Sequence, residues 1–435
     1  MKIKGLSKEK IKQISSFKQE DKKTLDFRLN SYEKFKEIPL PKFGPEINLD
    51  FDNINYYQTS DDSLTDNWNS IENETKQELD NLGVISSEQY LDGIGVQYQS
   101  EVIYHNMLEE LKEKNVIFTS IEQAFKNHRD LIDKYFSKIV KPEENKFTAL
   151  NSAVFSGGSF IYIPKNTKLD RPLQSYFRIN SKDLGQFERT LIIVDDNSSL
   201  HYVEGCTAKS YSTSNLHAAV VEIYVGKNSK CRYSTIQNWA TNVYNLVTKR
   251  AVVEENGTME WIDGNIGSKK TMKYPCCVLK GDNSKGTCIT ISVATTNQHQ
   301  DSGARMIHVG KNTESSIISK SIAKCGGKAD FRGEIRIEKE ADNSSSIVKC
   351  DTLILDEKSS SDAFPIDTVK NKKSNIEHEA TVSKISEEKL FYLMSRGLSE
   401  EEAIDLVVLG FTEEFKKELP MEYAVELNQL LKQNI

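Results

Sequence analysis

Cysteine is scarce in this chain, and its spacing excludes two familiar uses of the residue. Seven cysteines in 435 residues are too few and too irregularly placed for a disulfide framework. The sequence contains no CxxC pair, so neither a zinc site nor a ferredoxin-type cluster site is encoded locally. Cys276 and Cys277 are adjacent and would face opposite sides of a strand. We expect about half of the cysteines to be small buried hydrophobic residues.

Long apolar runs and an excess of positive charge are also missing. No apolar stretch approaches the roughly 20 residues that span a bilayer, and residues 1–10 lack the apolar core of a signal sequence. The chain has 64 acidic and 57 basic side chains, whereas binding to phosphate backbones requires a basic field. We therefore expect a cytoplasmic protein that binds neither membranes nor nucleic acids.

What the sequence does contain is a repeat in its middle, with a period of about 30 residues. Each repeat has a turn that begins with Asn: Asn166, Asn197, Asn228, Asn256, Asn283, Asn312 and Asn343. Runs such as Leu191–Val194 and Val221–Val225 lead into these turns and favour strands. Asn is the non-glycine residue that best tolerates left-handed backbone angles, so the repeated unit is a strand, an Asn corner and a strand. This period, with no helical pattern between the strands, predicts a β-solenoid.

The repeat divides the chain into three regions, which we place at 1–145, 146–382 and 383–435. The first is a helical or mixed region, with helical signals at Ser7–Ile14 and Glu101–Leu111. The second is the parallel β-helix core, so the fold class is mainly β.

Helical patterning returns in the third region. Ser386 is the predicted N-cap of a helix that closes at Gly397, and Ser399 with Glu402 forms a capping box for the next helix. These short helices have broad apolar faces. Such faces suit a cap on the open end of the solenoid or a docking surface for another subunit, and the two roles are compatible.

Alignment of the coils on their Asn residues predicts which side chains point inward. Five residues after the Asn the side chains are mostly apolar, so odd offsets face the interior. These residues are Arg171, Tyr202, Tyr233, Trp261, Cys288, Ile317 and Val348. Nine residues after the Asn the side chains are small or polar instead: Ser175, Cys206, Gln237, Asn265, Ser292, Ser321 and Thr352. Because buried polar groups need partners, this Asn+9 column indicates either a hydrogen-bonded ladder or a polar channel.

Several longer motifs carry a resemblance to a known family. They include Gly185–Ile193, Tyr202–Thr207, Leu216–Glu222, Tyr233–Trp239, Met306–Thr313, Glu377–Thr381 and Arg396–Ala403, with Asp26–Leu29 and Pro41–Pro45 in the first third of the chain. Together they resemble the SufB/SufD family of the SUF iron-sulfur cluster assembly system, over nearly the whole sequence. A CxxC-containing N-terminal motif found in some SufB-like chains is absent here.

The resemblance implies a right-handed parallel β-helix flanked by helical regions, acting as an assembly scaffold and not as an enzyme. It implies a partner chain, either SufD-like or a second SufB-like copy, and a SufC-like ABC ATPase docked on the C-terminal helices. Sulfur would arrive as persulfide from a cysteine desulfurase with its sulfur-transfer protein, and a transient iron-sulfur cluster would pass to apo acceptor proteins. The alternative to a cytoplasmic location is a plastid-type organelle. Whether a reduced flavin binds stays open.

The same resemblance assigns residues to sulfur uptake. The sulfur-accepting thiol corresponds to Cys206. Family residues required along the sulfur route correspond to Arg178, Asn180, Gln237, Trp239 and Lys249. We expect a neighbouring cation, such as Arg178 or Lys249, to lower the pKa of the Cys206 thiol, because the thiolate is the nucleophile.

Cluster building is assigned by the resemblance to Cys350 and to an acidic residue at the assembly interface, Glu379, which lies beside Glu377 and His378. A soft thiolate at Cys350, with carboxylate or imidazole from Glu379 or His378, would suit the ligation of a labile cluster. Without the family resemblance, Glu377, His378 and Glu379 would be interpreted as an exposed polar stretch.

The spacing of the repeat bears on this assignment. Cys206 and Gln237 share a column one coil apart, whereas Cys206 and Cys350 are five coils apart, which corresponds to ~24 Å. Thiols at that distance cannot exchange sulfur directly. If both act, a polar path through the interior is required, which favours the channel interpretation of the Asn+9 column.

Two alternative functions make different demands on the sequence. A β-solenoid enzyme acting on polysaccharides would need paired carboxylates or a calcium-binding Asp cluster on an outer groove, and the outward columns contain neither. A SufD-like structural partner would lack the equivalents of Cys206 and Cys350. The segment Gly281–Thr287 lacks the ending of a Walker A motif, so ATP hydrolysis is expected to belong to a partner.

Overall fold

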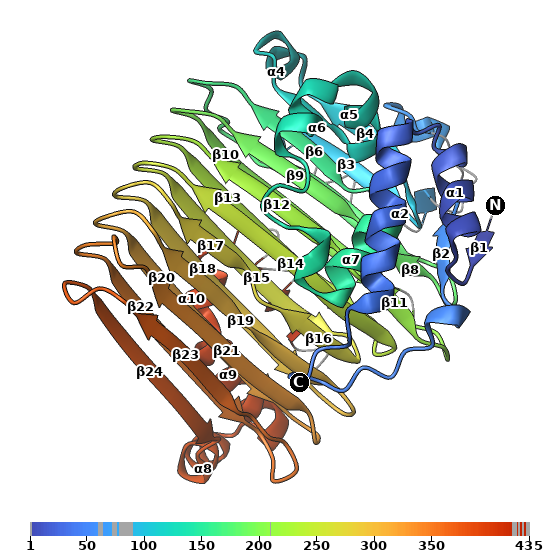
Figure 1. The fold of residues 1–435 in the computed structure, drawn as a ribbon. Coiled ribbons are helices and arrows are strands. Elements are labelled where there is room, and N and C mark those ends of the chain that lie inside the picture. The colour runs from blue at the N-terminus through green and yellow to red at the C-terminus, as the bar shows by residue number, and fades with distance from the viewer. Residues whose placement is uncertain are drawn as a thin grey trace.

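The computed structural model describes residues 2–59, 64–71, 76–77, 90–208, 210–419, 424, 427–428 and 430–431. Strands dominate it, and its core is a parallel β-solenoid of about 8 turns. Figure 1 shows the strands stacked as rungs, with helices at both ends of the chain. The prediction of a mainly β, solenoid fold is confirmed.

Two long sheets form the walls of the solenoid. The first sheet runs in the order β4 (Glu101–Met107), β3 (Gly93–Tyr98), β7 (Leu173–Ile179), β10 (Ser199–Ala208), β13 (Lys230–Trp239), β15 (Thr258–Gly267), β18 (Lys285–Ala294), β20 (Glu314–Ala323), β22 (Ser345–Ile354) and β24 (Asn375–Lys384). The second runs β5 (Ile117–Ser120), β6 (Ser159–Ile163), β9 (Arg189–Val194), β12 (Val220–Val225), β14 (Val243–Val253), β16 (Lys270–Lys273), β19 (His299–His308), β21 (Lys328–Ile337) and β23 (Ala363–Val369), with β8 (Gly185–Gln186), β11 (Asn215–His217) and β17 (Cys276–Leu279) beside it. A small antiparallel pair, β1 (Lys2–Lys4) and β2 (Asn55–Gln58), stands apart.

The Asn corners have the geometry predicted for them. All seven Asn residues have φ between 53° and 61°, in the left-handed region. Their side chains also form a ladder from coil to coil, as in the 3.1 Å bond from Asn197 Nδ2 to Asn166 Oδ1 and the 3.0 Å bond from Asn256 Nδ2 to Asn228 Oδ1. The repeated Asn therefore serves both the turn and the stacking of one turn on the next.

The register of the first sheet confirms the Asn+9 column over six coils and corrects its first member. Cys206 pairs with Gln237, and the pairing continues in step down to Thr352. In the first coil, however, Cys206 pairs with Phe177, and Ser175 pairs with Glu204. Two extra residues after the first corner cause this shift. They also leave Arg171 exposed at the surface, where it pairs with Asp92 at 3.0 Å.

Helices of the first region cover the outside of the second sheet. They are α1 (Lys8–Phe17), α2 (Lys22–Glu37), α5 (Ile121–Asn127), α6 (Arg129–Tyr135) and α7 (Lys146–Val154), with the 3-10 turns η1 (Phe51–Asn53) and η4 (Pro142–Glu144). Two other elements lie elsewhere: α4 (Glu109–Glu113) packs with the interior core through Leu111, and η2 (Trp68–Ser70) packs on the first sheet, where the Trp68 ring lies 5.1 Å from that of Tyr104. Ser7 caps α1 as predicted, accepting a hydrogen bond from the backbone of Lys10. Leu150 of α7 packs with Tyr244 and Leu246 of β14 in one apolar cluster, and Figure 1 shows α2 and α7 lying across this sheet.

The predicted helix at Glu101–Leu111 is wrong for most of its length. Residues Glu101–Met107 form β4, which pairs antiparallel with β3 at the end of the first sheet. Ile103, Tyr104 and Met107 are buried there, so pairing and burial override the local helical pattern. Only α4 follows the prediction.

The C-terminal helices are α8 (Glu387–Ser395), α9 (Glu400–Phe411) and α10 (Glu413–Lys416). Ser386 caps α8 and Ser399 forms a capping box with Glu402, both as predicted. Val408 and Phe415 pack on apolar side chains of the outer face of the first sheet. The remainder of the expected helical region, at 420–423, 425–426, 429 and 432–435, lies outside the described residues. Among the helices that the structure describes, none is long and apolar enough to cross a membrane.

Candidate functional site

Two adjacent columns of polar residues line the inside of the first sheet. The Asn+9 column contains Cys206, Gln237, Asn265, Ser292, Ser321 and Thr352, and all six are buried. A second column, at Asn+7, contains Glu204, Thr235, Asp263, Thr290, Ser319 and Cys350, and these are buried too. The two thiols singled out from the sequence therefore belong to neighbouring columns of one continuous polar stripe. Their strands, β10 and β22, are five steps apart in the sheet, as expected.

Cys206 is the first residue of the Asn+9 column in chain order, on β10. Its Sγ is 3.7 Å from Oε1 of Glu204, and only 1% of the residue is exposed. Gly205, between them, faces the other side of the sheet, where an added Cβ would lie 2.8 Å from the ring of Tyr176. The Glu-Gly-Cys motif thus places two polar side chains inward and leaves room for an aromatic ring outside.

Four buried charged groups gather next to this thiol. Lys249 Nζ is 3.9 Å from Oε1 of Glu204 and 3.4 Å from Oδ1 of Asp263. Lys273 Nζ is 2.8 Å from the other oxygen of Asp263. Burial lowers the pKa of Lys273 to about 8, although the charge of Asp263 opposes this shift. Burial also opposes ionisation of Asp263, but the charges of Lys273 and Lys249 outweigh it and the pKa of Asp263 is lowered.

An amide and imidazole network extends from this charge cluster. The Oε1 of Gln237 accepts hydrogen bonds from Lys273 Nζ and Asn245 Nδ2, each at 2.9 Å. Asn245 Oδ1 lies 2.8 Å from Nδ1 of His217, whose Nε2 is 2.9 Å from Glu188. These contacts fix the amide of Gln237 with its oxygen on Lys273 and Asn245, so its NH₂ group points elsewhere.

Several buried polar atoms along the stripe have no hydrogen-bond partner among the described residues. Near Cys206 they are Nε2 of Gln237 and Nε1 of Trp239, and further along they are Oγ1 of Thr235 and Thr290, Oδ1 of Asn265 and Oγ of Ser321. A buried polar group without a partner costs roughly 1–3 kcal/mol. A simple hydrogen-bonded ladder would satisfy its own members, so the stripe differs from such a ladder.

Trp239 packs against Cys206. Both belong to one buried cluster with Phe177 and Val243, and the indole ring lies 4.6 Å from the imidazole of His217. Arg178 and Asn180 lie one coil away. Arg178 Nη1 donates to Thr207 Oγ1 at 2.9 Å. Asn180 Nδ2 donates to the hydroxyl of Tyr98 at 2.6 Å.

The expected lowering of the Cys206 pKa is wrong for the structure as it stands. Burial raises the pKa of this thiol well above its usual value, and the charges of Glu204 and Glu188 add to the shift. Lys249 and Lys273 act in the expected direction, but burial outweighs them. Arg178 bonds to Thr207, whose side chain lies on the opposite face of β10. Cys206 is therefore a protonated thiol at neutral pH.

Cys350 lies at the other end of the stripe, one strand from the edge of the sheet. Burial, followed by the charge of Asp351, raises the pKa of this thiol to about 12, while hydrogen bonds to Ser319 and Thr352 oppose the shift. Its partner on β24 is Ala380. Like Cys206, it needs a change of environment or an incoming cation to become a thiolate.

The Glu-His-Glu motif is only partly brought together with Cys350. His378 belongs to the inward-facing set of β24 and lies 3.2 Å from Asp367. Glu377 and Glu379 pair with Ile347 and Lys349, on the opposite face of the sheet from Cys350. Within this chain, Glu379 and the thiol therefore point away from each other.

The last coil leaves apolar side chains exposed. Ile366, Val369 and Val382 on β23 and β24 are each 48% exposed. On α8, Phe391 is 75% exposed and Tyr392 55% exposed. Figure 1 shows β24 as the outermost rung, with α8 beside its end. This end of the molecule has more exposed apolar surface than single scattered residues provide.

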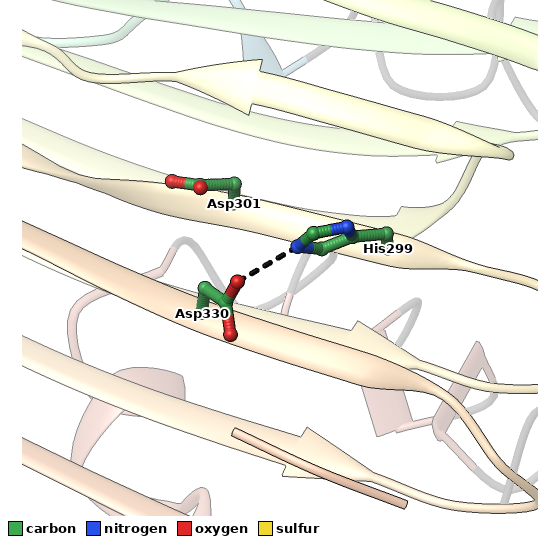
Figure 2. Close-up of side chains that lie close together, drawn as sticks. All are labelled: His299, Asp301 and Asp330. Carbon is green, nitrogen blue, oxygen red and sulfur yellow. Dashed lines mark hydrogen bonds and ion pairs between the residues drawn. The ribbon is translucent and has the colours of Figure 1, made fainter. Parts of the chain in front are cut away.

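A separate cluster, His299, Asp301 and Asp330, brings three potential metal-binding atoms within 4.8 Å of one another. Figure 2 shows His299 reaching Asp330 on the neighbouring strand, at 2.8 Å, while the carboxylate of Asp301 points away along β19. Cations already occupy both carboxylates: Arg332 lies 2.9 Å from Asp301 and Lys328 lies 3.3 Å from Asp330. We interpret the cluster as an ion-pair network.

Sequence reasoning missed the charged part of the site. Glu204, Asp263 and Lys273 were not predicted, and neither were His217 and Asn245. The signal for the first two was present, since both occupy the Asn+7 position and odd offsets face inward. Lys273, His217 and Asn245 come from the second sheet, whose coils vary too much in length for the Asn alignment to place them.

Comparison with known proteins gives consistent matches. The family described as SUF system FeS cluster assembly, SufBD core domain, matches residues 177–411, and the SufBD protein N-terminal region matches residues 89–175. The iron-sulfur cluster assembly protein SufB of Bacillus subtilis (strain 168) is 55% identical over 430 residues, which are 98% of this chain and 92% of that protein. An iron-sulfur cluster assembly SufBD family protein of Staphylococcus aureus (strain USA300) has the same identity and coverage.

Proposed function

Because the chain belongs to the SufBD family of iron-sulfur cluster assembly proteins, we propose that it is the scaffold subunit that accepts sulfur at Cys206 and builds the cluster at Cys350. The observation that carries this proposal is the buried polar stripe that joins the two thiols. An apolar solenoid core would be more stable than one with unpartnered polar atoms. The polar stripe is therefore best explained by a function that requires it.

Sulfur uptake would begin at the Cys206 thiol. A persulfide carrier presents its outer sulfur, and the product is a persulfide on Cys206. The unpartnered N–H groups of Gln237 and Trp239 would bind the anionic terminal sulfur, as donors held in a water-poor site. Gln237 is suited to this role because Lys273 and Asn245 hold its amide oxygen.

Sulfur would then pass along the stripe to Cys350. Ser292 and Ser321 in one column, and Thr290 and Ser319 in the other, offer small side chains with polar ends. Cys350, one strand from the open end, would hold the growing cluster as cargo. Since Glu379 faces away from Cys350 in this chain, we propose that it contributes from the interface with a partner chain, SufD-like or a second copy, beside His378.

Energy would come from a partner. Gly281–Thr287 crosses a solenoid corner at Asn283, where φ is 58°, and lacks the Walker A ending. We place the SufC-like ATPase on the exposed apolar side chains of α8, Phe391 and Tyr392. The chain itself would act as a scaffold and not as an enzyme.

Serine variants of three thiols test the proposal in the co-expressed, anaerobically isolated complex. Cys206→Ser should abolish sulfur bound as persulfide, and Cys350→Ser should abolish the cluster while persulfide still forms on Cys206. Cys231→Ser is the matched control, because Cys231 is buried in the apolar core outside the stripe and should change neither readout. Wild-type iron and sulfide in Cys350→Ser would refute the assignment.

A further inference from the structure

One carboxylate lies in direct contact with the sulfur-accepting thiol. The Oε1 of Glu204 is 3.7 Å from Cys206 Sγ. Its other oxygen accepts a hydrogen bond from the phenol of Tyr233. Burial raises the pKa of Tyr233 well above its usual value, so this phenol remains a donor. Glu204 is thus held by one oxygen, and the other oxygen is directed at the thiol and at Lys249.

We propose that Glu204 accepts the proton of Cys206 when a persulfide delivers its outer sulfur, and that Lys249 and Lys273 stabilise the negative charge that develops on sulfur. The inference rests on the proposed function of Cys206 and adds to it a proton acceptor that neither the family resemblance nor the comparisons assign.

The step balances without an outside oxidant. The Sγ–H bond of Cys206 breaks and its proton goes to Oε1 of Glu204. Sγ attacks the outer sulfur of the donor R–S–SH, forming a new S–S bond, and the donor S–S bond breaks with its electron pair leaving on R–S⁻. The products are a Cys206 persulfide and the donor thiol, which takes up the proton from Glu204. One sulfane sulfur moves, and no net oxidation occurs.

The charge balance of the site favours this route. At pH 7 two cationic side chains, Lys249 and Lys273, face two carboxylates, Glu204 and Asp263. Transfer of a proton from Cys206 to Glu204 moves a negative charge from oxygen to sulfur and leaves that balance unchanged. Releasing the proton to solvent would instead add a buried charge, which is costly in a site this poor in water. Lys249 also lies over the Tyr233 ring, 4.4 Å from its centroid, which holds it beside the Glu204 carboxylate, 3.9 Å from Oε1.

A purely electrostatic role for Glu204 makes the opposite prediction. The negative charge of Glu204 raises the pKa of Cys206, as does that of Glu188. If Glu204 acted only through its charge, Glu204→Gln would produce more thiolate and faster sulfur uptake. If Glu204 accepts the proton, the same change slows uptake at neutral pH. The titratable groups around the thiol in this comparison are Tyr202, Tyr233, Lys249, Asp263, Lys273 and Glu188.

The experiment measures the rate at which Cys206 gains one sulfur atom from glutathione persulfide, between pH 6 and pH 9, by mass spectrometry of the full chain. Glu204→Gln should slow the reaction by about 100-fold at pH 7, the lower range for general base catalysis, and its rate should rise steadily with pH. Glu260→Gln is the matched control, since it makes the same change at a carboxylate that faces outward on the same sheet, where it pairs with Arg232 and Lys230 and not with the groups around the thiol. It should not slow the reaction.

A second variant keeps the test decisive if Glu204→Gln fails to fold. Tyr233→Phe keeps the ring but removes the hydrogen bond to the Glu204 carboxylate. Loss of a donor to the charged form raises the pKa of the carboxyl group. The rate of sulfur uptake falls at low pH as the carboxylate becomes protonated, and we call this part of the rate profile its acid limb. The acid limb should therefore move to higher pH in Tyr233→Phe, a shift that a merely structural role would not produce.

Two results would overturn the inference in distinguishable ways. If folded Glu204→Gln takes up sulfur at or above the wild-type rate at pH 7, or if the limb stays in place in Tyr233→Phe, Glu204 is not the proton acceptor and the proposed function stands. If wild-type Cys206 gains no sulfur while another thiol does, the proposed function fails, and the inference fails with it.

Discussion

The buried pair of Lys273 and Asp263 makes the cluster beside Cys206 sensitive to pH, and Asp263→Asn tests this sensitivity. Both side chains are buried, at 0% and 3% exposure, with 2.8 Å between Nζ and Oδ2. The variant removes the carboxylate nearest to Lys273. Breaking a buried pair from one side typically costs about 3–5 kcal/mol. Here the loss should be smaller, because Lys273 can give up its proton.

The pKa of Lys273 sets the size of that loss. With a pKa of about 8, removing its proton costs about 1.4 kcal/mol at pH 7 and about 2.7 kcal/mol at pH 6, and nothing above pH 8. Without Asp263 the pKa falls further, so the variant holds a neutral Lys273 over part of the range in which the wild type holds the charged pair. The destabilisation should therefore shrink by up to about 2.7 kcal/mol between pH 6 and pH 9.

Urea unfolding at pH 6, 7, 8 and 9 measures this directly. The matched control is Glu222→Gln, which breaks the fully buried pair with Arg189, where Nη2 and Oε2 are 2.7 Å apart. Because arginine does not titrate in this range, the control should lose the same stability at every pH. A loss in Asp263→Asn that is equally large at pH 6 and pH 9 would refute the reasoning.

Three further predictions follow from the stripe, the last coil and the outer ion pairs. Ser292→Phe should block the interior, so that persulfide forms on Cys206 but no cluster appears, whereas Ser292→Ala should retain the cluster. A normal cluster yield in the Phe variant would place the sulfur route elsewhere. Phe391→Glu, at an exposed position of α8, should weaken ATPase binding in a pull-down by at least about tenfold, or about 1.4 kcal/mol, while the melting temperature of the chain stays unchanged. Undiminished binding would place the docking surface elsewhere. Asp330→Asn should leave Fe²⁺ binding in equilibrium dialysis unchanged, because Lys328 and His299 already occupy this carboxylate. Loss of bound iron would show that His299, Asp301 and Asp330 form a metal site.

The solenoid could be predicted from the sequence because its determinants are local and repeated. An Asn at each corner specifies a left-handed backbone position, and strands on either side alternate inward and outward with a period of two. The capping residues Ser386, Ser399 and Glu402 specified the helix starts for the same reason. The strand at Glu101–Met107 could not be found in this way, because its conformation depends on pairing with β3, which is a contact with the rest of the fold.

The candidate site was predictable only where it follows the repeat. Cys206, Gln237 and Cys350 lie on the first sheet, where six coils keep one register. Lys249 came from the family resemblance. Lys273 lies on β16, a short strand followed by a break before β17, so no regular offset from an Asn corner reaches it. Its role depends on an ion pair with Asp263, which lies on the opposite sheet. The alignment of coils contains no information about contacts between the two sheets.

The two polar columns also account for the offset between the thiols. Cys206 is at Asn+9 and Cys350 at Asn+7, so a route confined to either column would miss one of them. The Asn+9 column ends at Thr352, whose side chain hydrogen-bonds with Cys350, and Glu204 of the Asn+7 column contacts Cys206 at the other end. Successive inward side chains on one strand project from the same face, so the proposed sulfur route could change columns at any coil. A stripe two residues wide is therefore the narrowest arrangement that connects both thiols, and the unpartnered polar atoms of Thr235, Asn265, Thr290 and Ser321 lie between them.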